Sequence, residues 1–344
     1  MKLALAGFGG VGRQLVMLLA EKAPAWESHY GVRLELVAVA TRERVLMEPR
    51  GLPLDSMAQL AREGRALGGD ADQGGLFRAG AGVLIDATPT NLYTGEPALS
   101  LLRTAFDHRM HAVVLSKGAL VRAYPELDRR AREAGVALKF SGAVAAALPT
   151  ADTVHYALAG ATVLGFTGIL NGTTNFILSF MTESGAGYDE ALQEARRRGI
   201  AEADPALDVD GHDTAAKICI LANAVLRANL GLEDVHVTGI RDLPQAEIAA
   251  ARARGRVLKL VGEARSGPDG VRARVELKAL PAGSLLAGVG GSAKAIVYQT
   301  DTMGELALVG GASDPRGAAA AALKDVLNLR NHGPGWPGMT GKKG

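Results

Sequence analysis

Short apolar runs alternate with longer mixed segments along the first 140 residues of the chain. Each run has the length of one buried strand, and the segments between the runs have the composition of helices or loops. This alternation predicts an α/β fold with a doubly wound parallel sheet. Residues 48–82 fit the alternation poorly, and only a helix around 53–64 is expected there. The runs are KLALA (2–6), RLELVAVA (33–40), GVLIDAT (82–88), HAVVLS (111–116) and VALKF (136–140).

A different pattern follows residue 141 and predicts a second, α+β domain. The run from 256 to 280 is split by GPDG, whose turn chemistry predicts a β-hairpin. The other expected elements are a helix that follows SGAVAAALPT (141–150), a strand at 161–170, and helices at 188–198 and 213–228.

The composition fits a soluble globular protein of about two domains. The 344 residues carry a net charge of +2, which gives no electrostatic case for binding nucleic acid or an acidic membrane. The single cysteine, Cys219, excludes an internal disulfide and lies in an apolar run, which favours an inert buried thiol. The N-terminus lacks a convincing signal-peptide cleavage site, and no apolar stretch is long enough to span a membrane. A cytoplasmic protein is therefore expected.

The first apolar run leads into a glycine-rich turn and then an amphipathic segment. Gly7, Gly9 and Gly12 form the pattern G-x-G-x-x-G between a strand and a helix, which is typical of a Rossmann dinucleotide site. The pattern allows a tight turn and lets a pyrophosphate approach the free N–H groups at the helix N-terminus. A turn that merely requires glycine is the alternative. The expected cofactor contacts are Gly7, Phe8, Gly9, Gly10, Val11 and Gly12.

The choice between NAD and NADP is made at the end of the second strand. An acidic residue there would accept hydrogen bonds from the adenosine ribose and favour NAD. This chain has Thr41 and Arg42 instead, with no carboxylate before Glu43. A guanidinium can pair with a 2′-phosphate, so the sequence favours NADP and leaves NAD as the second choice. A solvated surface arginine is the alternative.

Polar residues follow two further strands, at the ends where ligands bind in sheets of this kind. Thr88, Thr90 and Asn91 come after one strand and are expected to line the nicotinamide half of the cofactor. Ser116 and Lys117 come after another. Burial can lower the pKa of a lysine towards neutrality, which would make Lys117 a proton carrier. By chemistry alone a surface charge is equally expected there.

Five carboxylates and a lysine crowd into residues 202–217. Asp213 and Lys217 are four residues apart, so both lie on one face near the start of the following helix. A helix N-cap at Asp213 is the structural alternative. A calcium loop is excluded because the spacing departs from the EF-hand pattern and no glutamate closes the loop. The carboxylates are Glu202, Asp204, Asp208, Asp210 and Asp213, and His212 among them is expected to be exposed.

With these motifs in this order, the whole chain resembles the homoserine dehydrogenases, in their short monofunctional form without a regulatory ACT domain. GILNGTTNFIL (168–178) matches a family motif, and TPTN (88–91) and SKGAL (116–120) follow the glycine loop in the expected order. The family signature joins an alanine and a glycine to D-P, to D-hydrophobic-x-G-x-D and to a lysine. Its matches here are Ala195, Gly199, Asp204, Pro205, Asp208, Gly211, Asp213 and Lys217.

The resemblance implies that L-homoserine and L-aspartate 4-semialdehyde interconvert by hydride transfer with a nicotinamide cofactor, in threonine, methionine and isoleucine biosynthesis. It implies that Lys117 is the acid/base residue, with Asp213 and Lys217 beside the reacting group. Asp204 is expected to be structural and Asp210 solvated. A homodimer formed through the second domain is also implied. The implied substrate contacts are Gly172, Thr173, Glu202, Asp208, Asp213 and Lys217.

The resemblance also implies how the chain is divided. We expect a Rossmann domain at 1–143, completed by about 304–330, and a substrate-binding and dimerisation domain at 144–303, with a disordered tail at 336–344. Many members carry, in place of Ser141, a glutamate that joins backbone carbonyls around a monovalent cation. Ser141 therefore argues against a sodium site built from Val144 and its neighbours.

Two other functions are weighed against this one. A related dehydrogenase for another amino-acid aldehyde would keep the glycine loop but not the joint set Glu202, Asp213 and Lys217. A non-catalytic NADP-binding sensor would be expected to lose Lys117 or Asp213, and this chain retains both.

Overall fold

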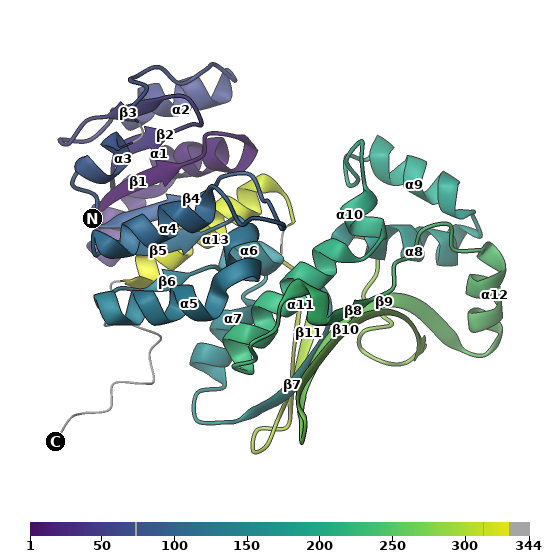
Figure 1. Cartoon of the computed structure of the whole chain (residues 1–344). Helices are drawn as coiled ribbons and strands as arrows, with labels where there is room; N and C mark the ends of the chain where they lie inside the picture. Colours follow the sequence, from purple (N-terminus) through teal and green to yellow (C-terminus); the bar gives the residue numbers. More distant parts are fainter. Residues whose placement is uncertain (73, 312, 330–344) are drawn as a thin grey trace. The chain divides into compact units, whose positions relative to one another are not determined.

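The computed structural model describes residues 1–72, 74–311 and 313–329, and the chain forms two compact units (Figure 1). The first unit is Met1–Ala147 and takes up the chain again from Asp314, and the second is Leu148–Ser313. The expected divisions are 143/144 and near 303/304. The later division differs because residues 305–309 form a strand of the second unit's sheet. The tail expected at 336–344 lies outside the described residues.

A six-stranded sheet forms the centre of the first unit. Its strands are β1 (Lys2–Ala6), β2 (Glu35–Ala40), β3 (Val45–Met47), β4 (Val83–Asp86), β5 (His111–Val114) and β6 (Leu138–Lys139). They lie in the order β3-β2-β1-β4-β5-β6, and the neighbouring pairs from β2 to β6 are parallel. The predicted parallel α/β sheet is therefore confirmed, with one difference: the edge strand β3 runs antiparallel to β2.

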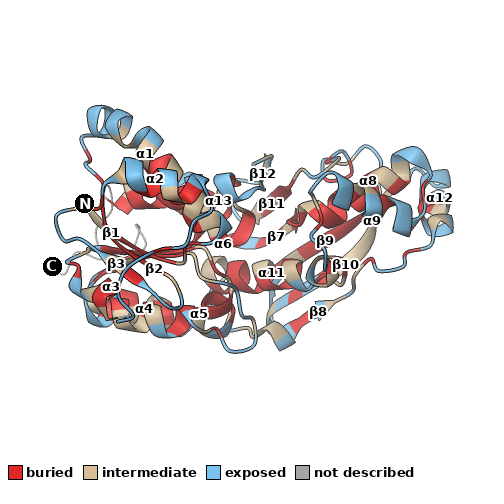
Figure 2. Ribbon diagram, turned by 90° about the horizontal axis from the view of Figure 1, so that it is seen from above, coloured by how far each residue is buried: buried red, intermediate tan, exposed pale blue. Residues whose placement is uncertain are grey.

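Helices cover both faces of this sheet. They are α1 (Gly10–Tyr30), α2 (Leu54–Arg62), α3 (Gly75–Arg78), α4 (Ala98–Asp107), α5 (Gly118–Ala134), α6 (Ser141–Ala145) and α13 (Pro315–Asn328). Figure 2 shows α1, α2 and α13 on one face and α3, α4 and α5 on the other. Helix α13 begins after Asp314, whose carboxylate accepts from Gly317 N over 2.7 Å. It brings Leu323 and Val326 into the core with Leu15 of α1.

The second unit is built on another six-stranded sheet. Its strands are β7 (Val163–Ile169), β8 (Val235–Val237), β9 (Arg256–Gly267), β10 (Gly270–Pro281), β11 (Ala295–Thr300) and β12 (Glu305–Val309). They lie in the order β12-β11-β7-β9-β10-β8 and are antiparallel except between β10 and β8. The predicted hairpin is confirmed, because β9 and β10 pair from Gly267 and Gly270 outwards.

Helix α11 packs against β9 and β10 of this sheet. Gly262 of β9 keeps the contact close, because a side chain there would lie 2.6 Å from Ile218 of α11. The helices are α7 (Thr150–Asp152), a π-helix (Thr153–Ala157), α8 (Gly172–Ser184), α9 (Tyr188–Arg197), α10 (Ala206–Val209), α11 (His212–Val225), a 3₁₀ helix (Leu232–Asp234) and α12 (Gln245–Ala253). Across the described ranges, none of the helices combines the length and apolar character needed to cross a bilayer.

The strand expected at 161–170 and the helices expected at 188–198 and 213–228 are confirmed as β7, α9 and α11. The helix expected after SGAVAAALPT is confirmed as α7 and the π-helix that continues it to Ala157. The structure adds the short helix α6 within SGAVAAALPT itself. Ala146 has φ +50°, which is incompatible with helical geometry, so α6 ends there.

Candidate active site

Two glycines of the G-x-G-x-x-G turn are required by close contacts between backbone segments. Gly7 has φ +100°, and a side chain on it would lie 2.3 Å from Ala87 O, just beyond β4. A side chain on Gly12 would lie 2.1 Å from Gly7 O. Gly9 differs, because a side chain there would meet open space and no side chain caps the first N–H groups of α1. The turn therefore combines an uncapped helix N-terminus with an exposed glycine, the arrangement that suits a pyrophosphate.

Arg13, in the first turns of α1, ties the glycine turn to α2. Its guanidinium donates to four carbonyls at the end of α2 and just beyond, over 2.7–3.3 Å. The same guanidinium lies 4.6 Å from the centroid of the Phe8 ring. Phe8 is buried, and its ring braces the turn against Arg13. Of the predicted contacts in this turn, Gly9 and Gly10 are exposed and Val11 is half-buried.

The turn after β2 holds the two residues expected to choose the cofactor. Thr41 Oγ1 accepts from Arg44 N over 3.1 Å and donates to Arg44 O over 3.3 Å, so this hydroxyl shapes the turn. Arg42 follows directly and is exposed. Its position beyond the carboxyl end of β2 is where the adenosine ribose lies in folds of this kind.

A buried carboxylate that the sequence analysis did not single out ends β4. Asp86 is fully buried and accepts from the hydroxyls of Thr88 and Ser116, each over 2.5 Å. Burial raises the pKa of Asp86, and the hydrogen bonds from Ser116 and Thr88 oppose that shift. The structure thus brings Thr88 and Ser116 together from neighbouring strands. The signal in the sequence is an acidic residue closing the apolar run GVLID.

Lys117 stands directly before α5, and the predicted cofactor residue Thr90 holds its backbone. Its N–H donates to Thr90 Oγ1 over 3.1 Å. Asn91 Oδ1 accepts from two N–H groups of its own turn, each over 3.0 Å. Gly118 lets the two segments cross closely, since a side chain on it would lie 2.3 Å from Asn91 O. Lys117 itself is half-buried.

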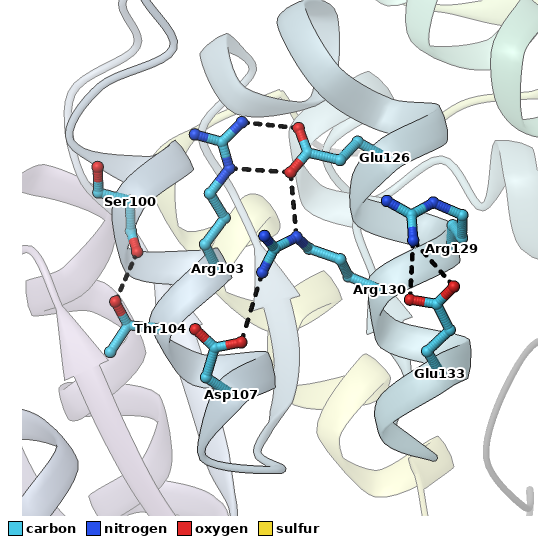
Figure 3. Close-up of polar contacts among 8 residues, drawn as sticks. All are labelled: Ser100, Arg103, Thr104, Asp107, Glu126, Arg129, Arg130 and Glu133. Atoms are coloured by element: carbon cyan, nitrogen blue, oxygen red, sulfur yellow. Dashed lines mark hydrogen bonds and ion pairs between the residues drawn. The ribbon is translucent and has the colours of Figure 1, made fainter.

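An ion-pair network braces α5 against α4 (Figure 3). Arg103 of α4 donates to both carboxylate oxygens of Glu126 on α5, over 2.6 and 3.0 Å. Glu126 also lies 3.1 Å from Arg130, which reaches back to Asp107 of α4 at 3.4 Å. The hydrogen bond from Arg103 lowers the pKa of Glu126. The network restrains the helix that begins directly after Lys117.

In the second unit, four polar side chains meet where the starts of α8 and α11 approach α10. Asn171, which precedes α8, donates from Nδ2 to Asp208 Oδ1 over 2.6 Å and to Asp213 Oδ2 over 2.8 Å. Lys217 Nζ lies 2.6 Å from the same Asp213 Oδ2 and donates to Leu170 O over 2.7 Å. We call Asn171, Asp208, Asp213 and Lys217 the carboxylate cluster. Three of its members are predicted site residues, and Asn171 is an addition from the structure.

The ionisation of Asp208 depends on its neighbours in the carboxylate cluster. Burial raises the pKa of Asp208, and the charge of Asp213 raises it further. The hydrogen bond from Asn171 and the charge of Lys217 act in the opposite direction. With both acids ionised and the lysine protonated, the cluster has one net negative charge. It therefore suits a ligand with a positive group, such as an ammonium.

Gly172 and Thr173, which are predicted substrate contacts, open α8 directly after the cluster's Asn171. A side chain on Gly172 would lie 2.9 Å from Ser292 O, so glycine allows α8 to approach that loop. Thr173 is buried and donates from Oγ1 to Ile200 O over 3.1 Å. This hydrogen bond ties α8 to the start of the acidic stretch.

The other residues of the acidic stretch lie in different surroundings. Glu202 and His212 are exposed, as was expected for His212. Asp204 Oδ1 accepts from a backbone N–H two residues later over 3.1 Å, which confirms its structural role. Asp210 is partly exposed at the surface, in keeping with its expected solvation, and Arg241 also donates to both of its oxygens over 2.6 and 2.7 Å. Arg241 also lowers the pKa of Asp210.

Comparison with known proteins decides the family. The family model for homoserine dehydrogenase matches residues 149–327, just over half of the chain. The NAD(+)-dependent homoserine dehydrogenase of Pseudomonas canavaninivorans is 36% identical over 337 residues, which cover 95% of this chain and 96% of that relative. The chain belongs to the homoserine dehydrogenase family.

Other members of the homoserine dehydrogenase family agree with this chain along its length. The enzyme of Methanocaldococcus jannaschii is 32% identical over 338 residues, covering 96% of this chain and 99% of that relative. The crystal structure of a putative homoserine dehydrogenase from Archaeoglobus fulgidus matches with a TM-score of 0.86 at 30% identity, covering 96% of this chain and 99% of that one. The chain is therefore an NAD(P)-dependent oxidoreductase that acts on the CH–OH group of a small amino acid, in amino-acid biosynthesis.

The residues around α6 do not fit the monovalent cation implied by the resemblance to homoserine dehydrogenases. The N–H and hydroxyl of Ser141 donate to the two oxygens of the buried Asp325, over 2.9 and 2.8 Å. The Lys324 ammonium lies 2.8 Å from Ser141 Oγ and 2.9 Å from Asp325 Oδ1. A second cation here would be repelled by this ammonium. We therefore assign no chemical step to a cation beside Ser141 or Val144.

Proposed function

We propose that this homoserine dehydrogenase prefers NADP and binds L-homoserine and L-aspartate 4-semialdehyde at the carboxylate cluster. The observation that carries the proposal is the meeting of Asp208, Asp213 and Lys217, all from one family motif, around the amide of Asn171. Homoserine carries an ammonium, a carboxylate and a primary alcohol. The net negative charge of the cluster matches the ammonium, and the exposed Glu202 offers a third carboxylate from the same acidic stretch.

Oxidation of the alcohol removes a hydride and a proton. The nicotinamide ring, when bound, accepts the hydride, and the proton needs a basic group near the hydroxyl oxygen. Lys217 acts as a donor to both Asp213 and Leu170 O, which suits a residue that orients the substrate oxygen more than one that accepts its proton. We therefore assign proton transfer to Lys117, whose backbone Thr90 holds at the end of a strand.

The cofactor contacts are assigned to the first unit. The N–H groups beside Gly9 and Gly10 suit the pyrophosphate, and Thr88, Ser116 and Asn91 suit the nicotinamide half. Arg42 is assigned to the 2′-phosphate of NADP, because it is exposed at the expected end of β2. The Pseudomonas relative is named as NAD(+)-dependent, so the preference of this chain is to be decided by measurement with both cofactors.

A homodimer through the second unit is supported by one face of its sheet. Helix α11 packs on the side to which Gly262 points. Successive residues of a strand point to opposite faces, so Glu263 faces the other way. On that face Arg274 and Lys278 of β10 both pair with Glu263. Glu263 and Lys278 are half-buried and Arg274 is exposed, so this face presents both charges, and we propose it as the contact about a two-fold axis.

The dimer can be tested by sedimentation. A dimer mass that becomes a monomer mass in Glu263→Lys would support this face as the interface. A monomer mass of the unaltered chain at every concentration would contradict the dimer. We also propose a cytoplasmic location, which rests on the biosynthetic role alone.

The activity is tested by following absorbance at 340 nm with aspartate semialdehyde and either NADPH or NADH. We expect turnover with both and a higher kcat/KM with NADPH. Lys117→Ala should lower kcat by about 10²–10⁴ while the cofactor Kd changes little. Turnover only with a different amino-acid aldehyde would favour a related dehydrogenase, and NADPH binding without turnover would favour a sensor.

A further inference from the structure

Every polar atom of the Asn171 side chain forms a hydrogen bond. The residue is 5% exposed, and Oδ1 accepts from Thr174 N over 2.9 Å, which caps α8. Its two Nδ2 protons point to Asp208 and Asp213, over 2.6 and 2.8 Å. The orientation of the amide is therefore determined, because the opposite one would turn a carbonyl oxygen towards two carboxylates.

The amide is neutral, and this matters for the charge of the carboxylate cluster. Asp208 comes from α10 and Asp213 from α11, so the two acids reach Nδ2 from different helices. A lysine in the place of Asn171 would also hold them, but it would cancel the negative charge that remains beside Lys217. An amide satisfies both carboxylates and leaves that charge for a ligand.

We propose that Asn171 is a positioning residue of the dehydrogenase reaction, whose amide holds Asp208 and Asp213 as a fixed pair that receives the ammonium and hydroxyl groups of the substrate. The inference rests on the proposed function, because it takes the carboxylate cluster as the substrate site. It assigns to Asn171 a role that neither the sequence motifs nor the capping of α8 requires.

Two substitutions separate this role from helix capping. Asparagine, aspartate and serine are comparable N-caps, so Asn171→Asp and Asn171→Ser keep the acceptor that α8 needs. Both remove the amide protons that join the two acids. A residue that only caps α8 would tolerate either change, with Tm and kinetic constants close to those of the unaltered chain.

We expect Asn171→Ser to raise the KM for homoserine at least about tenfold, the loss expected for one hydrogen bond to a charged group. The KM for NADP should stay within about twofold, since the proposed cofactor contacts lie in the first unit. Asn171→Asp adds a third carboxylate to the cluster. In a plot of kcat/KM against pH, the fall in activity on the acidic side (the acid limb) should therefore shift to higher pH by about one unit or more.

Asn223→Asp is the matched control for an amide-to-acid change inside the second unit. Asn223 is buried on α11, where its amide exchanges two hydrogen bonds of 2.9 Å with the backbone of Leu230. This variant should lose thermal stability and keep the unaltered KM and acid limb. Circular dichroism melting curves of all variants establish that kinetic changes are read on folded protein.

Each outcome decides the inference. If both Asn171 variants keep the homoserine KM and the acid limb of the unaltered chain, Asn171 serves only as the N-cap of α8. If both variants fail to fold, Asn171 is required for the structure and the positioning role is contradicted. Failure of the proposed function looks different: Asp213→Asn would then keep normal homoserine kinetics, whatever the Asn171 variants do.

Discussion

Lys217 follows Asp213 by one helical turn on α11, and its Nζ lies 2.6 Å from Asp213 Oδ2. The same oxygen also accepts a hydrogen bond from the Asn171 amide, so it has a charged donor, the Lys217 ammonium, and a neutral one. The side chains of Lys217 and Asp213 are only 13% and 14% exposed, so water and salt screen their attraction weakly. The pair therefore differs from the exposed ion pairs elsewhere on the chain, whose net contribution is small.

Replacing Lys217 by methionine should disable substrate binding. Lys217→Met removes the cation from beside Asp213, and we expect kcat/KM for homoserine to fall by about 10–100-fold, as for a lost charge-assisted contact. Steady-state kinetics at saturating NADP would measure this loss. Arg241→Met is the control, because it breaks the Asp210 ion pair in the same acidic stretch but outside the cluster. An equal loss in both variants would indicate general destabilisation of the stretch.

Arg42→Ala tests the cofactor preference. The variant should weaken NADP binding by about 1–3 kcal/mol and leave NAD binding nearly unchanged, because only NADP carries the 2′-phosphate. Fluorescence titration with each cofactor measures both values. Arg44→Ala is the matched control, since Arg44 lies in the same turn but donates to Gly69 O. Equal effects of Arg42→Ala on both cofactors would show that Arg42 does not contact the phosphate.

Gly12→Ala should destabilise the first unit even without cofactor. The added methyl group would lie 2.1 Å from Gly7 O, so α1 must shift away from the turn, at a cost of about 1–3 kcal/mol. Urea unfolding of the cofactor-free protein gives this difference. Gly10→Ala places the same methyl group in open space on the same helix and should change stability by less than about 1 kcal/mol. Similar unfolding curves for both variants would contradict the close contact.

A buried lysine should make stability depend on alkaline pH. Lys259 is 2% exposed and donates to Asn175 Oδ1, Ser179 Oγ and Val289 O over 2.6–3.2 Å. Burial lowers its pKa from 10.5 to about 8. Between these values the unfolded chain binds more protons than the folded one, so the free energy of unfolding should rise with pH, by roughly 1–3 kcal/mol in all.

Urea unfolding at several pH values from 7.5 to about 10.5 would measure this rise. It should be absent from Lys259→Met and present in Lys278→Met, because Lys278 is the residue directly opposite on β10 and pairs with Glu263. A rise that survives in Lys259→Met would have to be assigned to another group.

The sequence predicts well those features that depend on residues close together in the chain, such as turns. GPDG specifies the β9–β10 turn, and the backbone contacts at Gly7 and Gly12 explain why only glycine fits there. The single mismatch within the sheet of the first unit is β3, whose three residues are too few to show any periodicity.

Contacts between distant parts of the chain are what the sequence could not predict. The sequence does not show that Asp210 pairs with Arg241, because the two residues lie 31 positions apart. A lysine in a strand is usually exposed, but Lys259 of β9 is buried by contacts with α8 and with the loop at Val289. Asn171 shows in the sequence only as a residue before a helix, because its two carboxylate partners lie 37 and 42 positions later.

The helix that completes the core of the first unit, α13, is synthesised after the whole second unit. Helix α13 covers Leu15 with Leu323 and Val326, and Leu148–Ser313 separates it from the rest of the first unit. A nascent chain that ends before Pro315 therefore exposes an apolar face of α1, and limited proteolysis of ribosome-bound chains stalled there would detect it. During synthesis, the unit that emerges first is the one whose core is completed last.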